Sequence, residues 1–85
     1  MTSLFTFSPY WGERLIVEGP GGSFGLEHPL GVPSVVLPPE EEWREKGPPW
    51  ARGLWPELHS ELDEWCRKSD CALRVEEGAL VVHGD

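Results

Sequence analysis

Residues 56–69, PELHSELDEWCRKS, decide the fold class because they carry the clearest periodicity in the chain. Their apolar residues recur at the spacing of one α-helical face: Leu58, Leu62, Trp65 and Cys66. Pro56 suits the first turn of a helix, where its missing N–H has no partner to lose. The stretch therefore predicts an amphipathic helix that buries one face against the rest of the chain.

Strands are predicted on both sides of this helix. Four of them form two hairpins: residues 13–18 with 23–28, and residues 72–76 with 79–83. The first hairpin would close through a four-residue loop, residues 19–22, and the second through a tight turn at Glu77-Gly78. Short strands at residues 4–7 and 35–37, and two helical turns at residues 40–46, complete the expected elements. An antiparallel sheet of about four or five strands, covered on one face by the main helix, is the simplest packing, so the predicted class is α+β.

The length of 85 residues suits a single domain, residues 1–85. Leu, Ile, Val and Phe make up about a quarter of the chain, which is more than disordered proteins contain. The nine prolines and ten glycines imply long ordered loops. The chain has no Asn and no Gln. This depletion is typical of proteins from thermophiles, although a GC-rich genome would produce part of the same bias.

Residues 38–55, here called the connector, are rich in tryptophan and proline. Two interpretations of the connector stay open. Its tryptophans either cover the open end of the sheet or project as anchors, because Trp and Arg are the usual hot-spot residues of interfaces. Trp55 is also expected to join the start of the helix to the sheet, and the role of Trp11, outside the connector, is equally open. The candidate interaction surface consists of Trp43, Arg44, Trp50, Arg52 and Trp55.

The net charge of −8 is concentrated in residues 40–64. Binding to nucleic acid requires a basic patch, and the only adjacent cations are Arg67-Lys68, so no nucleic-acid partner is expected. An acidic surface favours a basic protein partner, because complementary charge steers association. The alternative explanation is that the charge only keeps a small domain dissolved.

The two cysteines, Cys66 and Cys71, are too few for a disulfide framework or a zinc site. Two buried thiols are expected, with a bridge across the helix–strand corner as the alternative. The chain begins without a basic region followed by an apolar run, and it has no apolar stretch long enough to span a bilayer. No membrane partner is therefore expected, and the predicted location is the cytoplasm.

Motifs for catalysis or metal binding are weak in this sequence. Residues 21–25 fit G-x-S-x-G, but a nucleophile elbow needs a strand–turn–helix around the serine, and a hairpin strand is expected here. The adjacent carboxylates of residues 40–42 match no calcium-binding loop. His59 and Asp63 lie one helical turn apart, on a face expected to be solvated. No catalytic residue, metal site or cofactor is predicted.

The sequence favours a small acidic interaction protein without enzymatic activity. It would dock a basic protein partner, or a second copy of itself as a homodimer, through the candidate interaction surface, and inhibition of that partner is one form this role could take. One alternative is a small-molecule binding module with a site lined by tryptophan. The other, ranked last, is an enzyme whose site forms at a dimer interface around His59 and Asp63.

Overall fold

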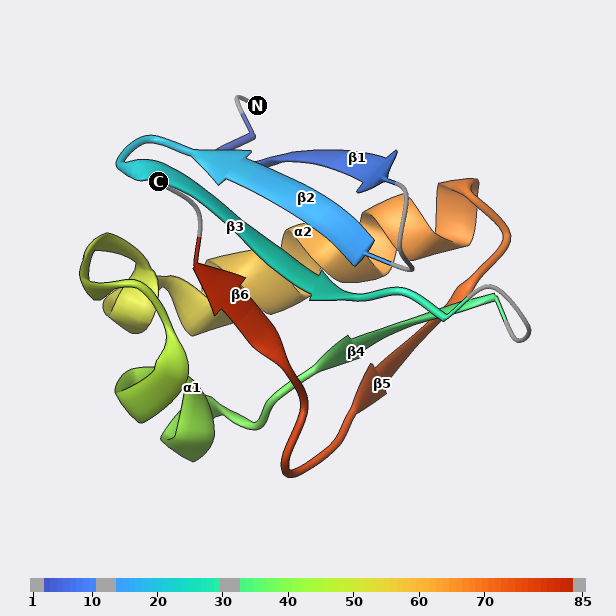
Figure 1. Cartoon of the computed structure of the whole chain (residues 1–85). Coiled ribbons are helices and arrows are strands. Elements are labelled where there is room, and N and C mark those ends of the chain that lie inside the picture. The colour runs from blue at the N-terminus through green and yellow to red at the C-terminus, as the bar shows by residue number, and fades with distance from the viewer. Residues whose placement is uncertain (1–2, 11–13, 30–32, 84–85) are drawn as a thin grey trace.

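The computed structural model describes residues 3–10, 14–29 and 33–83, and these residues form a curled sheet with helices on one side (Figure 1). In chain order the elements are β1 (Thr6–Tyr10), β2 (Arg14–Gly19), β3 (Gly22–Glu27), β4 (Ser34–Leu37), α1 (Glu40–Lys46), the 3₁₀ helix η1 (Pro49–Leu54), α2 (Trp55–Lys68), β5 (Ala72–Val75) and β6 (Val81–His83). The α+β class is confirmed, as are both predicted helices. Trp11 lies outside the described residues.

The sheet is mixed but mostly antiparallel. Its order is β1-β2-β3-β4-β5, with β6 also paired to β3. The far edge of β3 is shared between two strands: residues 24–26 pair with β6, and Glu27 pairs with Val36 of β4. Beyond that point β4 pairs in parallel with β5. Because β3 pairs with β4 at one residue only within the described chain, β4 diverges from β3 and the sheet curls around the core.

The first predicted hairpin is confirmed, although its turn is shorter than expected. β2 and β3 pair antiparallel as far as Gly19 and Gly22, so only Pro20-Gly21 form the turn. β1 pairs with β2 and starts later than predicted, at Thr6. It then continues through Pro9, because an edge strand tolerates the missing proline N–H.

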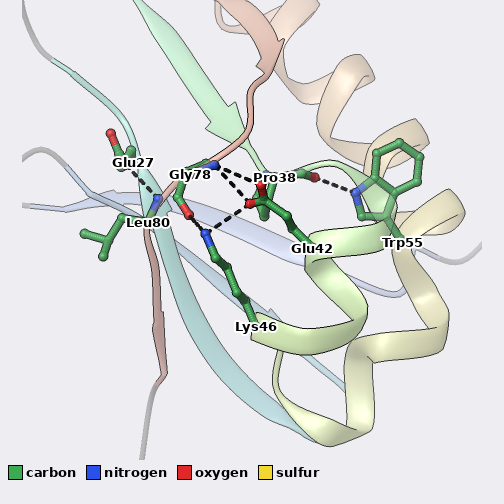
Figure 2. Close-up of polar contacts among 8 residues, drawn as sticks. Glu27, Pro38, Glu42, Lys46, Trp55, Gly78 and Leu80 are labelled. Carbon is green, nitrogen blue, oxygen red and sulfur yellow. Dashed lines mark hydrogen bonds and ion pairs between the residues drawn. The ribbon is translucent and has the colours of Figure 1, made fainter.

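The second predicted hairpin is wrong. Gly78 does make a turn, with a φ of 77°, but β5 pairs with β4 while β6 crosses to β3. Side chains from distant elements form hydrogen bonds with residues 78–80, which belong to the crossover from β5 to β6 (Figure 2). The Gly78 N–H donates to Glu42 Oε2 at 3.0 Å, the Leu80 N–H to Glu27 Oε1 at 2.7 Å, and Lys46 Nζ to the Ala79 carbonyl at 3.2 Å. These long-range contacts override the local turn signal.

Helix α2 lies against one face of the sheet, behind it in the view of Figure 1. The predicted apolar face of α2 is confirmed: Leu58, Leu62 and Cys66 are buried and join one hydrophobic cluster with residues of β2, β3 and β4. Trp65 sits at the margin of this core, half-buried, with its ring 6.0 Å from that of Phe7. The helix therefore holds the β1 side of the sheet as well as its centre.

Candidate functional site

Trp43 is a core residue. Its side chain has no exposed surface, its Nε1 donates to the Ala51 carbonyl at 2.8 Å, and its ring meets that of Phe24 edge-on with centroids 5.1 Å apart. Gly47 packs so closely on the indole that an added Cβ would lie 2.8 Å from Trp43 Cε2. Trp43 is thus not available to a partner in this structure, and its assignment as a surface anchor is wrong, because the small core needs the indole to fill it.

Trp50 packs on the glycine-rich turn between β2 and β3. A Cβ added to Gly21 would lie 2.6 Å from Trp50 Cβ, and one added to Gly19 would lie 2.6 Å from Trp50 Cη2. On its inner side the indole contacts the rings of Phe5 and Phe24, with centroids 6.3 and 5.9 Å away. The glycines therefore provide a stretch of bare backbone on which the indole packs, and the half-buried Trp50 closes the end of the core.

The remaining connector residues are partly committed to the fold. Trp55 Nε1 donates to the Pro38 carbonyl at 2.9 Å (Figure 2), and its ring stacks on His59 with centroids 4.9 Å apart. Arg52 Nε donates to the Gly47 carbonyl at 2.8 Å. Arg44 is exposed and forms a long ion pair with Glu40, at 3.8 Å. The structure thus brings the connector together as a lid on the core, and a partner surface formed by Trp50, Trp55 and the two arginines stays a prediction.

The residues considered for catalysis have other partners. His59 stacks on Trp55, and Asp63 forms an ion pair with Arg67 at 2.9 Å. Ser23 lies within strand β3, opposite Glu18, rather than at a strand–helix turn. Within the described parts of the chain, no group of three or more His, Cys, Asp or Glu side chains is arranged to hold a metal ion.

The two cysteines meet at the corner between α2 and β5 as free thiols. The helix ends there because Asp70 takes a left-handed conformation, with a φ of 58°, and the Cys71 N–H donates to the Cys66 carbonyl at 2.9 Å. Burial raises the pKa of the Cys66 thiol to about 12, and the hydrogen bond with Cys71 adds to this effect. Cys66 is buried as expected, whereas Cys71 is only half-buried.

An open groove runs between β1 and α2. One part, of about 380 Å³, is lined on the sheet side by Phe5, Thr6 and Phe7 and on the helix side by Glu61, Glu64, Trp65 and Lys68. A second part, of about 760 Å³, continues along α2 past Glu57 and Leu4, and shares Glu61, Glu64 and Lys68 with the first. We call these two connected parts the acidic groove, because three glutamates of α2 face one lysine there.

Glu61 fixes the chain at the start of the acidic groove. Its two carboxylate oxygens accept the backbone N–H groups of Leu4 and Phe5, each at 3.0 Å. Lys68 pairs with Glu64 at 3.1 Å, and both side chains remain well exposed. Glu57 is exposed and Leu4 keeps 42% of its surface in solvent. The groove therefore presents carboxylates, an exposed leucine and an edge of the sheet together.

The acidic groove was not predicted from the sequence, although the sequence contains a signal for it. Glu57, Glu61 and Glu64 recur at i, i+4 and i+7, so they share one face of the predicted helix, beside the apolar face. Nothing in the sequence indicated that β1 would lie along that face. The groove thus depends on a contact between elements more than 50 residues apart, such as that of Glu61 with Leu4, which are 57 residues apart.

Among the described residues no helix is both long and apolar enough to cross a membrane. Comparisons of the chain with protein-family models, with curated proteins and with solved structures gave no significant match.

Proposed function

We propose that the protein binds a basic segment of a protein partner in the acidic groove. The observation that carries this proposal is the combination of three glutamates of α2 with the uncovered edge of β1 in one open groove. Lysine or arginine side chains of a partner would meet carboxylates there, and the chain's overall charge of −8 would steer such a partner toward the protein.

The acidic groove supports this role better than the connector does. Trp43 is buried, and Trp55 Nε1 and Arg52 Nε donate to carbonyls of the protein itself. Glu57 and Glu64, in contrast, line the acidic groove with exposed side chains, and the contact that Glu64 makes with Lys68 is an exposed ion pair. A small-molecule site walled by tryptophan has less support, because the acidic groove contains a single tryptophan of the described chain, Trp65, and Trp43 is buried in the core.

A titration with a labelled peptide of alternating lysine and threonine tests the proposal. The double variant Glu57→Gln/Glu64→Gln should bind the peptide about three- to tenfold more weakly, since an exposed charge pair is worth about 0.2–1 kcal/mol. The matched control is Glu41→Gln/Glu45→Gln, which removes the same charge from exposed positions on α1, outside the groove. Equal affinities of the two double variants would show that only net charge matters and would refute the groove.

A further inference from the structure

We infer that the basic segment binds as an extended strand that adds to β1, with basic side chains at every second position. This inference rests on the proposed function, because it names how the acidic groove takes its partner. It is carried by the direction of the backbone groups of β1, by the position of α2 above them and by the distribution of charge.

The outer edge of β1 pairs with no other strand of the described chain. Within residues 3–10, 14–29 and 33–83, β1 is the first strand of the sheet and pairs with β2 alone. In an antiparallel pair, the N–H and C=O of successive residues point alternately toward and away from the partner strand. Pro9, which has no N–H, belongs at a position pointing away from β2. Phe7, two residues earlier, therefore directs its N–H and C=O into the acidic groove, next to Glu61 and Glu64.

The edge of β1 offers fewer N–H donors than carbonyl acceptors. Pro9 has no donor, and the Phe5 N–H is already taken by Glu61 at 3.0 Å. Within the described parts of the chain, Phe7 supplies the one N–H of this set without a partner, and the carbonyls of Phe7 and Pro9 remain as acceptors. A second copy of β1 would bring the same shortage of donors and the same glutamates, so self-pairing is disfavoured by hydrogen bonding and by charge.

A strand added at this edge has a defined pattern of side chains. Successive side chains of a strand point to opposite faces of the sheet, so every second side chain of the added strand would face α2. Glu61 and Glu64 line the groove on that face, and Glu57 lies further along α2, whereas Ser8 on β1 is exposed to solvent. The occupant is therefore a segment of about five to seven residues, matched to the length of β1, with Lys or Arg at alternate positions.

Two peptides of equal composition separate this inference from simple charge attraction. Acetyl-Lys-Thr-Lys-Thr-Lys-Thr-Lys-amide places all of its lysines on one face of a strand, and acetyl-Lys-Lys-Lys-Lys-Thr-Thr-Thr-amide does not. The alternating peptide should bind at least about fivefold more tightly to the wild-type protein. If both bind equally and both are weakened by Glu57→Gln/Glu64→Gln, the groove stands and strand addition is wrong.

Backbone methylation provides the second test. In an extended peptide, the amides of the lysines point to one side and those of the threonines to the other. N-methylation of one set should reduce affinity at least about tenfold by blocking the pairing with Phe7, and methylation of the other set should change it less than about threefold. Equal effects of the two methylated peptides would overturn the inference. Failure of every peptide to bind would overturn both this inference and the proposed function.

Self-association is measured on the same samples. Sedimentation of the wild-type protein should give a monomer at micromolar concentrations. A dimer that is lost when Phe7 is replaced by proline, a change that removes the free N–H, would show that the occupant of the groove is a second copy and would refute the basic segment.

Discussion

Replacement of Gly21 by alanine should destabilise the protein through Trp50 alone. The new Cβ would lie 2.6 Å from Trp50 Cβ and 2.7 Å from Trp50 Cδ2, distances that real Cβ atoms do not show, so the indole must move off the turn. Gly21 does not take a left-handed φ, so alanine suits its backbone and would gain about 0.4–1 kcal/mol from the unfolded chain. Against this gain stands an overpacking cost of about 1–3 kcal/mol. The net loss should be about 1–2 kcal/mol.

A double-mutant cycle with Trp50→Ala isolates this contact. Trp50→Ala should itself cost about 2–4 kcal/mol, less than a fully buried tryptophan, because the indole is half-exposed. In that background Gly21→Ala should be neutral or slightly stabilising, which corresponds to a coupling of about 1–3 kcal/mol. Urea unfolding followed by circular dichroism gives the four free energies. If Gly21→Ala still destabilises the protein without Trp50, the cost does not come from the contact between Trp50 and the glycine turn, and this reasoning is refuted.

Two other glycines serve as controls for the cycle. Gly53 has open space around it and no left-handed φ, so Gly53→Ala should not destabilise the protein. Gly78 also has open space, but its φ of 77° should make Gly78→Ala cost about 1–2 kcal/mol through backbone strain. A loss at Gly78 should be independent of Trp50, unlike the loss at Gly21.

Two further predictions concern α2. In urea unfolding, Leu62→Ala should cost about 2–5 kcal/mol because it shortens a buried side chain. Glu61→Ala should cost about 1–2 kcal/mol because it leaves the N–H groups of Leu4 and Phe5 without their acceptor, whereas Glu64→Ala should change the stability by less than about 0.5 kcal/mol. Equal costs for Glu61→Ala and Glu64→Ala would contradict this role of Glu61. The raised pKa of Cys66, about 12 against an ordinary 9.0, means that the thiol ionises first in the unfolded state, so the free energy of unfolding should fall as pH rises above about 9. Cys66→Ala should remove this component of the slope, and an unchanged slope in the variant would show that other groups cause the loss.

The helices and the first hairpin could be predicted because their signals are local. The apolar face of α2 lies within two or three turns, and the glycines of the first turn are adjacent in sequence. The pairing of β5 and β6 could not be predicted in this way. The Glu77-Gly78 turn has the correct residue types, but Glu27, Glu42 and Lys46, which fix the crossover, lie 30 or more residues away in sequence.

The role of each tryptophan depends on tertiary contacts, and these contacts leave no periodic pattern in the sequence. Trp43 and Trp50 lie in a segment of prolines and short helices, so their spacing could not assign them to the core. A clue to Trp50 was present in the cluster Gly19, Gly21 and Gly22, since a bare stretch of backbone provides room for a large ring. The position of that ring follows only from the fold, which brings η1 to the turn of β2 and β3.

The acidic residues have different roles, and these roles can be told apart only once the fold is known. Glu27, Glu42 and Glu61 accept backbone N–H groups from segments far away in sequence, so these carboxylates stabilise the crossover and the start of β1. For Glu42, the hydrogen bonds from Lys46 and Gly78 lower the pKa of the carboxyl, as this role requires. The charge of −8 is therefore not simply a solubility device, nor is it wholly a signal of a partner. What distinguishes the acidic groove is that Glu57 and Glu64 line it with exposed side chains that accept no backbone N–H of the described chain. Glu64 forms an exposed ion pair with Lys68, and because exposed pairs are weak, a cation of the proposed partner would compete for this carboxylate as well as for that of Glu57.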